Sequence, residues 1–254
     1  MKISGSIVTY NNSETIEKCI SSILEETKDK SYDFKLYIYD NASSDDTVDI
    51  VSRFPEVKLI KADKNSGFGH GHNYIIRRVR SDYHFVINPD ISFLQQKDTL
   101  GEMVSYLQDH KDIGLITPKI LSPDMTEQAI PKYGPSIRFS FIGNLPGFKW
   151  LRRKYSRQDE NLSEPTDIEF CTGCFFGAGT EYLKYIRGFS SSYFLYCEDS
   201  DLSKRVLLDG RRIVYYPYVE AVHNWNRENT HSAKGFFRFL RSLLIYFRKW
   251  GWVI

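Results

Sequence analysis

The stretch ISGSIVTYNNSETIEKCISSILEET (residues 3–27) decides the fold class, because it passes directly from a β-branched apolar run to a segment with helical periodicity. In its second part, Ile16, Ile20 and Ile23 recur at intervals that place them on one face of a helix. A strand that runs straight into an amphipathic helix is the opening of a β-α-β unit. The chain is therefore expected to begin as an α/β domain.

The same alternation continues through the first half of the chain. Further strands are predicted at 34–40, 56–62 and 83–90, and further helices at 41–54 and 71–81. This order predicts a mostly parallel central sheet with helices on both faces, which is a three-layer sandwich of Rossmann-like character.

The second half is less regular. A helix near 96–110 and a strand near 113–117 are followed by a segment, 122–165, that is rich in proline and predicts long loops. Strand and helix signals return between 168 and 223.

Polar residues gather where the predicted strands end. They are Thr9, Tyr10 and Asn11, then Asp40 and Asn41, then Lys64 and Asn65, and finally Asn88, Pro89 and Asp90. Ligands of parallel α/β sheets bind outside the carboxyl ends of the strands. One edge of the sheet is therefore the predicted ligand site.

Composition indicates an ordinary globular protein, with 41% hydrophobic and 26% charged residues and a formal net charge of +2. Basic residues concentrate at 149–157 and after His231. The N-terminus lacks the pattern of a signal peptide, and no stretch approaches the roughly 18 to 20 apolar residues that span a bilayer. We therefore expect a cytoplasmic protein.

The four cysteines fit a reduced compartment better than a disulfide scaffold. Cys171 and Cys174 form a C-x-x-C pair, but no second pair stands at zinc-site spacing. We interpret them as structural thiols.

Three short motifs could carry chemistry. The glycine-rich loop NSGFGHGHN (65–73) could bring backbone N–H groups to an anionic ligand. The turn NPD (88–90) holds two oxygen-bearing side chains that could share a divalent cation. The segment YFLYCEDSDLSKRV (193–206) clusters three acids, a pattern also typical of a helix start. Each motif is weak alone.

Together with IVTYNN (7–12), YDNASSDDT (39–47), CTGCFFGAG (171–179) and the segment from Val222 onward, these motifs resemble family 2 glycosyltransferases of the GT-A fold. The likeness is greatest to bacterial rhamnosyltransferases of surface-polysaccharide assembly. It covers nearly the whole chain.

The resemblance implies a role for each matching residue. Contacts to the nucleotide sugar would come from Thr9, Tyr10, Asn11, Asp40, Asn65, Gly67, Phe68, Gly69, Asn73, Asn88 and Asp90. Mn²⁺ or Mg²⁺ would be bound by Asp90, His223 and Asn88, the last standing where many relatives carry aspartate.

The same resemblance divides the acids of 193–206 by role. Asp199 would be the catalytic base, and Glu198 and Gly173 would contact the acceptor. An inverting transfer needs a carboxylate that takes the proton of the attacking hydroxyl and a cation that neutralises the departing diphosphate. Asp201 is expected to help start the helix and to face away from Asp199.

The last residues are expected to form a basic, aromatic-rich amphipathic helix at 231–254. Its apolar positions recur at helical spacing: Phe236, Phe239, Leu240, Leu243, Phe247 and Trp250. Such a helix suits an anionic membrane surface, whereas the alternative is a helix packed on the catalytic domain. The rest of the chain, 1–230, would be one catalytic domain with a nucleotide-sugar half (1–120) and an acceptor half (121–230).

The leading hypothesis is a metal-dependent inverting transfer of L-rhamnose from dTDP-rhamnose to a polyprenyl-diphosphate-linked saccharide of O-antigen, capsule or cell-wall assembly. The enzyme would work at the inner face of the plasma membrane, with no nucleic-acid partner. One alternative is another donor, such as UDP-galactofuranose. Two other classes are a Rossmann-type oxidoreductase, which would need a glycine fingerprint after the first strand, and a nucleic-acid-binding module.

Overall fold

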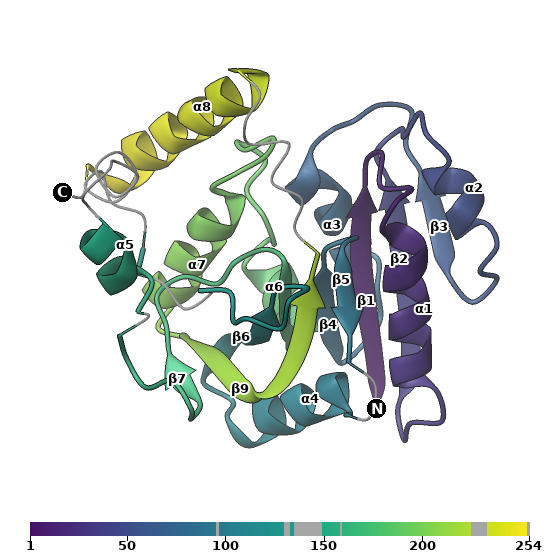
Figure 1. Ribbon diagram of the computed structural model, residues 1–254, viewed down its shortest axis with the longest axis horizontal. Coiled ribbons are helices and arrows are strands. Elements are labelled where there is room, and N and C mark those ends of the chain that lie inside the picture. The colour runs from purple at the N-terminus through teal and green to yellow at the C-terminus, as the bar shows by residue number, and fades with distance from the viewer. Residues whose placement is uncertain (95–96, 130–132, 135–148, 158, 225–232, 253–254) are drawn as a thin grey trace.

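The structure is a computed structural model that describes residues 1–94, 97–129, 133–134, 149–157, 159–224 and 233–252. Figure 1 shows the chain from its purple N-terminus to its yellow C-terminal helix. The elements in chain order are β1 (Lys2–Thr9), α1 (Ile16–Thr27), β2 (Asp33–Asp40), α2 (Thr47–Val51), β3 (Lys58–Lys61), α3 (Phe68–Ile76), β4 (Tyr83–Ile87), β5 (Ile91–Phe93), α4 (Thr99–Asp109), β6 (Ile113–Leu121), α5 (Lys149–Tyr155), β7 (Thr166–Asp167), β8 (Phe175–Gly179), α6 (Thr180–Tyr185), α7 (Glu198–Leu208), β9 (Arg212–His223) and α8 (Ala233–Trp250).

One mixed sheet runs through the described residues in the order β3-β2-β1-β4-β8-β6-β9-β5, with β7 paired to β9. The strands β3, β2, β1, β4, β6 and β9 run in one direction, whereas β8, β5 and β7 run in the other. The predicted mostly parallel sheet is therefore confirmed. The reversed β8 lies between β4 and β6 and joins the two halves of the sheet.

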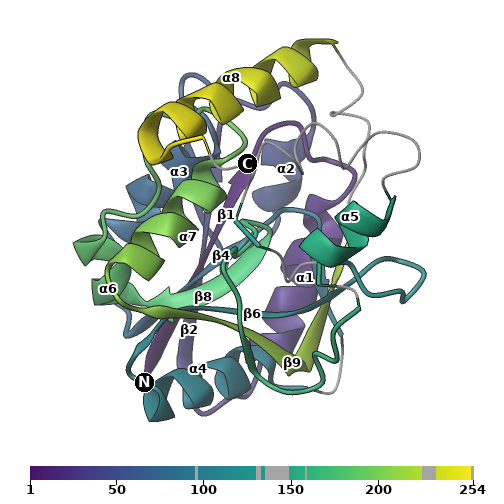
Figure 2. The same ribbon diagram turned by 90° about the vertical axis from the view of Figure 1, so that its left-hand side faces the viewer.

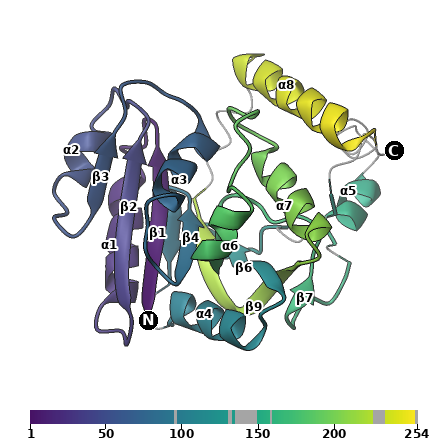
Figure 3. The ribbon, with the colours of Figure 1, turned by 180° about the vertical axis from the view of Figure 1, so that it is seen from behind.

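The sheet carries a separate core on each face, which confirms the three layers. Buried residues of α1, α2 and α4 pack on one face, and buried residues of α3, α6 and α7 pack on the other. Figures 1 and 3 show the sheet from these two sides. The alternation of side chains along β1 explains the division, because Ile3 and Ile7 point to the first core.

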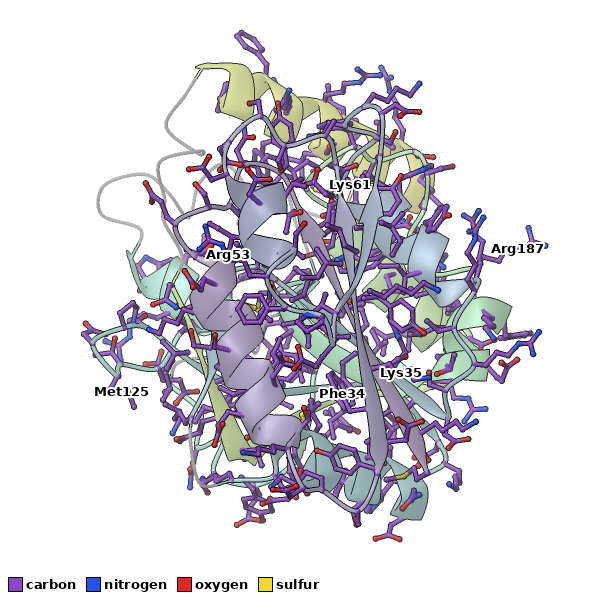
Figure 4. All side chains as sticks on the ribbon, turned by 90° about the vertical axis from the view of Figure 1, so that its right-hand side faces the viewer. Phe34, Lys35, Arg53, Lys61, Met125 and Arg187 are labelled. Carbon is purple, nitrogen blue, oxygen red and sulfur yellow. The ribbon has the colours of Figure 1, made fainter. Side chains whose placement is uncertain are left out.

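The carboxyl ends of the parallel strands lie at the upper edge of the molecule in Figure 1, on the side where α8 crosses. Figure 4 views the β3 side, with Lys61 at the end of β3 toward that edge and Phe34 at the start of β2 away from it. The predicted convergence of strand ends thus occurs at one edge.

Two local predictions were wrong. The segment 122–165, predicted as loops from its prolines, contains the helix α5. The helix predicted at 41–54 covers only Thr47–Val51, and Ala42 before it adopts a left-handed backbone with φ of 61°.

The helix α8 packs on the rest of the protein with its apolar side inward. Leu243 and Phe247 are buried together with Tyr193 and Cys197, and Figure 2 shows α8 lying across the start of α7. The predicted membrane-facing stripe is therefore largely used for packing within the protein. Among the described residues, no helix combines the length and the apolar character that crossing a membrane requires.

Candidate active site

Thr9 and Asp40 lie together at the ends of β1 and β2, where both are buried. The Thr9 hydroxyl donates to Asp40 Oδ1 at 2.9 Å, and the backbone N–H of Ser43 donates to Asp40 Oδ2 at 2.9 Å. These two hydrogen bonds fix the Asp40 carboxylate at the carboxyl ends of the strands. Beside it, Tyr10 is 51% exposed and extends from the protein.

The loop between β1 and α1 is tied to the loop after β2. The backbone N–H of Asn11 donates to Ser43 Oγ at 2.9 Å, and Asn11 Oδ1 accepts from the backbone N–H of Ser44 at 2.8 Å. These bonds hold two of the predicted nucleotide-sugar segments as one unit.

The glycine-rich loop is held by Asn41, which the sequence analysis did not assign. Its side chain donates to the Gly67 carbonyl at 3.2 Å and accepts from the Ser66 N–H at 3.2 Å. Asn65 Oδ1 accepts from the Gly67 N–H at 3.0 Å. Gly67 has a φ of 96°, and a side chain there would meet the Phe194 carbonyl oxygen at 2.4 Å, so only glycine fits.

The residues after Gly67 form the start of α3 and pack against the loop after α6. A side chain at Gly69 would meet Phe189 Cβ at 2.6 Å, and the Phe68 ring packs edge-on to Phe189. Asn73 is buried, and its amide exchanges two hydrogen bonds with the Phe189 backbone, at 2.7 and 2.8 Å. Asn73 therefore ties α3 to the loop after α6 with both ends of its amide, and its predicted contact to the donor stays a prediction.

Asn88, Asp90 and His223 meet where β4 ends and β5 pairs with the end of β9. Asp90 Oδ1 lies 3.3 Å from His223 Nε2. Within the described chain, Asn88 Oδ1 and Asp90 Oδ1 are buried oxygens without a hydrogen-bond partner. Buried acceptors of this kind are costly unless a donor or a cation satisfies them.

The orientation of His223 fits a cation site. Gln128 donates from its amide to the His223 carbonyl at 3.0 Å, and its Oε1 lies 3.1 Å from His223 Nδ1. An amide oxygen only accepts, so Nδ1 carries a proton and donates it to Gln128, which leaves Nε2 directed toward Asp90. A hard divalent cation matches this set of a carboxylate, an amide oxygen and an imidazole nitrogen. No group of three or more His, Cys, Asp and Glu side chains suited to a metal occurs in the described residues, because this set contains only two of those types.

The acids of the predicted catalytic pair differ in environment. Asp199 Oδ2 accepts from the Gly173 N–H at 3.2 Å, and Oδ1 accepts from the Ser200 N–H at 2.8 Å. Glu198 is buried, and burial together with the adjacent Asp199 carboxylate raises its pKa to about 8. Burial and the neighbouring carboxylate therefore favour the protonated form of Glu198 at neutral pH.

The segment Cys171–Cys174 joins the two acidic sites. The backbone N–H of Cys171 donates to Ser203 on α7 at 3.0 Å, and the carbonyl of Cys174 accepts from the Asn88 N–H at 2.8 Å. Gly173 lies between them, close to Phe68 and Asp199. Both cysteines are buried thiols, and burial raises the pKa of Cys171. Their position explains why the motif stands beside a catalytic segment without supplying its reactive group.

Asp201 has a larger role than the sequence analysis assigned. It lies in the first turn of α7, as expected, but it is completely buried and binds Arg205, Lys249 and Trp250. Two of these partners belong to α8. No signal in the sequence indicated that the two α8 residues or Gln128 would contact the site. Asn41 could have been predicted, because it adjoins Asp40 at a strand end.

A family model described as "Glycosyl transferase family 2" matches residues 6–187, well over half of the chain. The chain belongs to glycosyl transferase family 2. This membership makes the protein a glycosyltransferase and decides against the oxidoreductase and nucleic-acid-binding alternatives.

Two curated relatives of this family 2 glycosyltransferase span most of its length. Rhamnosyltransferase WbbL of Escherichia coli K12 is 24% identical over 250 residues, which cover 94% of this chain and 90% of the relative. The N-acetylglucosaminyl-diphospho-decaprenol L-rhamnosyltransferase of Mycobacterium tuberculosis is 24% identical over 232 residues, which cover 85% of this chain and 74% of the relative. The resemblance to rhamnosyltransferases is thereby confirmed.

Solved structures show that the family 2 glycosyltransferase has the GT-A fold. The mannosyltransferase PcManGT of Pyrobaculum calidifontis, solved with GDP-Man and Mn²⁺, matches with a TM-score of 0.66 at 18% identity, over 97% of this chain and 63% of that one. GalNAc-T7, solved with UDP, GalNAc and Mn²⁺, matches with a TM-score of 0.69 at 12% identity, over 98% of this chain and 49% of that one. At these identities the likeness concerns the fold.

Proposed function

We propose that this glycosyltransferase moves L-rhamnose from dTDP-L-rhamnose to a polyprenyl-diphosphate-linked saccharide in surface-polysaccharide assembly, with inversion at the anomeric carbon. The observation that carries the proposal is the match to two rhamnosyltransferases over most of the chain. The name of the second specifies an N-acetylglucosaminyl-diphospho-polyprenol acceptor. The arrangement of Asp199 and of the Asn88–Asp90 turn supports the same reaction class.

Asp199 serves as the base in this proposal. Its two backbone N–H donors hold the carboxylate in one orientation, and burial favours the protonated form of the adjacent Glu198. It takes the proton of the attacking acceptor hydroxyl as the new glycosidic bond forms and the bond from sugar to diphosphate breaks. Glu198, whose Oε2 is buried without a hydrogen-bond partner in the described chain, offers a hydrogen bond to the acceptor.

Asn88, Asp90 and His223 would hold Mn²⁺ or Mg²⁺ in this proposal. The two buried oxygens and the oriented imidazole provide ligands of the appropriate chemistry. When bound, the cation neutralises negative charge on the departing diphosphate. The amide of Asn88 gives the site one charge fewer than two carboxylates would.

The donor would occupy the strand-end edge of the half formed by residues 1–120, and the acceptor would approach from the half formed by 121–230. The contacts expected from the first half are those of the Thr9–Asn11 segment, Asp40, and the loop from Asn65 to Gly69. The bonds from Asn41 and Asn65 support this assignment, because they orient the glycine-rich loop along that edge.

The protein would associate with the inner face of the plasma membrane through the outer side of α8. Phe237, Arg241, Leu244 and Arg248 stand at intervals of four, three and four residues, and all four are exposed. The helix has no acidic residue. Exposed aromatic and basic groups on one helical face favour an anionic lipid surface.

Two other basic residues add little to that surface. Arg153 pairs with Asp159 and Arg157 pairs with Glu160, so these charges are already compensated. Three further basic residues of this region could also contribute to the surface: Lys154 is exposed, whereas the side chains of Lys149 and Arg152 lie outside the description.

A donor panel tests the reaction. The purified protein is given a synthetic N-acetylglucosaminyl-diphospho-polyprenol with dTDP-L-rhamnose, UDP-galactofuranose or other nucleotide sugars, each with Mn²⁺, Mg²⁺ or a chelator. We expect product from dTDP-L-rhamnose alone, and only with metal. Product from UDP-galactofuranose alone would show that the donor is wrong, and no transfer from any donor would refute the enzyme mechanism.

A further inference from the structure

The turn that leads into α7 has a backbone that its own residues do not favour. Tyr196 and Cys197 are consecutive non-glycine residues in the left-handed region, with φ of 70° and 63°. Cys197 is the N-cap of α7 and supplies no side-chain cap. Left-handed conformations at such residues persist only where the surroundings impose them. We call residues 193–197 the corner. Because α7 begins directly after the corner, the backbone of the corner sets the direction in which the Glu198 and Asp199 side chains point.

The helix α8 contacts the corner directly. Ser242 donates from its hydroxyl to the Leu195 carbonyl at 2.7 Å. Leu243, Tyr246 and Phe247 form a buried cluster with Tyr193 and Cys197. One side of the left-handed pair is therefore fixed by a helix that follows it by some forty residues in the sequence.

Asp201 fixes the other side of the corner. Its carboxylate, which is 0% exposed, accepts from Lys249 Nζ at 2.6 Å and from Trp250 Nε1 at 2.9 Å. Arg205, one turn further along α7, donates to the same carboxylate at 2.8 Å. A buried carboxylate is tolerated only when such donors compensate it, so the position of α8 and that of the first turn of α7 depend on each other.

The corner also contacts the glycine-rich loop where it enters α3. The Phe194 carbonyl accepts from the Phe68 N–H at 3.1 Å, beside the glycine that fits only because it has no side chain. A displacement of the corner would therefore move the catalytic acids and disturb the glycine-rich loop as well.

We propose that α8 is a positioning element of the active site and that Asp201 is the positioning residue through which it acts. Lys249 and Trp250 hold Asp201, and with Ser242 they hold the left-handed corner, so that Asp199 faces the acceptor. The catalytic consequence rests on the function proposed for Asp199, whereas the mechanical one, a corner held by α8, does not. Lys249 and Trp250 thus support turnover without touching either substrate.

The test removes both donors from α8 with little change of shape, in the variant Lys249→Met/Trp250→Phe. Its matched control is Lys204→Met, which removes the charge of an exposed lysine on α7. Two quantities are measured in the full-length protein: kcat and KM for transfer to a water-soluble acceptor, and backbone amide hydrogen exchange at residues 194–200.

We expect kcat of the double variant to fall about 10- to 100-fold, the range that small misplacement of a catalytic group produces, with a smaller change in KM for the donor. Amide exchange at 194–200 should accelerate at least about tenfold, because the corner opens more often. The control should match the wild type in both measurements. The single variant Lys249→Arg, which keeps the charge, should retain more turnover than the double variant.

The outcomes separate this inference from the proposed function. If the wild type transfers no sugar, the proposed function fails, but amide exchange still decides whether α8 holds the corner. Unchanged exchange in a folded double variant overturns the inference, and so does a loss of turnover without faster exchange. Should the double variant not fold, Trp250→Phe alone removes one N–H donor, keeps an aromatic ring, and gives the same comparison.

Discussion

The two acidic sites of this glycosyltransferase are built in different ways. Asp90 stands on a short turn between β4 and β5, and its neighbour Asn224 donates to the Asp90 carbonyl from its backbone at 2.8 Å. Asp199 stands at the start of a helix, after two left-handed residues. The sheet holds the first site, and a distant helix holds the second.

This difference teaches where the protein can be perturbed. The backbone of a site on paired strands is as stable as the strands, because its hydrogen bonds are part of the sheet. A site at a strained helix start depends on contacts made elsewhere. The metal-binding side should therefore respond mainly to changes in its own ligands, and the base side should also respond to changes in α8.

Asn substitution of the base should have the largest effect. In Asp199→Asn the side chain keeps its size but can no longer take a proton, so transfer should fall about 100- to 10,000-fold at every metal concentration. Nucleotide affinity should be nearly unchanged, because the group acts mainly in the transition state. Steady-state kinetics and calorimetric nucleotide binding check both parts. Near-normal turnover would remove Asp199 from its role.

The pH dependence of stability should reveal the buried Glu198. Its pKa rises from an ordinary 4.5 to about 8 because of burial and the adjacent Asp199. Between these values the folded state binds more protons than the unfolded state, so the free energy of unfolding should fall as the pH rises from about 4.5 to 8, by on the order of a few kcal/mol.

Denaturant unfolding of the wild type and of Glu198→Gln across this pH range checks the prediction. The neutral amide cannot titrate, so the slope between pH 5 and pH 8 should be smaller in the variant. Equal slopes in the two proteins would show that Glu198 is not the buried acid that titrates.

The matching substitution in the sheet-held site should have a smaller effect and be rescuable. Asp90→Asn removes one charge from the cation ligands, and we expect Mn²⁺ binding to weaken about 10- to 100-fold, with transfer partly restored at high Mn²⁺. Asn88→Asp should change metal affinity in the opposite direction. Titration of Mn²⁺ in the presence of dTDP measures both. Identical affinities in all three proteins would place the metal elsewhere.

The smallest expected effect concerns the outer side of α8. Arg241→Gln should weaken binding to anionic vesicles by about 1 kcal/mol, or roughly fivefold, and leave transfer to a soluble acceptor unchanged. Arg53→Gln, on the face shown in Figure 4, is the charge-matched control. Sedimentation with anionic and with neutral vesicles separates the two variants. An equal loss of vesicle binding in both variants would show that the attraction does not depend on the outer side of α8.

Deleting residues 236–254 would be a poor test of membrane binding. It would remove Leu243 and Phe247 from the core together with the outer face of α8. Single substitutions on that face leave the inner contacts to Asp201 intact, so they separate the outer role of the helix from the inner one.

Much of the site could be predicted because it follows from local order. The first four strands alternate with helices and run parallel in one sheet, so the residues after them reach one edge of that sheet. Thr9 and Asp40 meet there as expected, and Asn88 and Asp90 lie at the next strand end. The bonds from Asn73 to the Phe189 backbone could not be predicted, because a motif gives the position of an amide but not the partner toward which it points.

The sequence by itself determined the α/β order, the polar strand ends, the acidic pair and the family resemblance, since these depend on periodicity and on residue types in short segments. Only the tertiary structure decided which side of α8 faces inward, which atoms Gln128 orients, and that Asp201 binds residues 48 and 49 positions away. Those contacts depend on how distant elements pack. An amphipathic helix shows an apolar side in its sequence, but whether a membrane or the protein covers that side depends on the surface it meets in the folded chain.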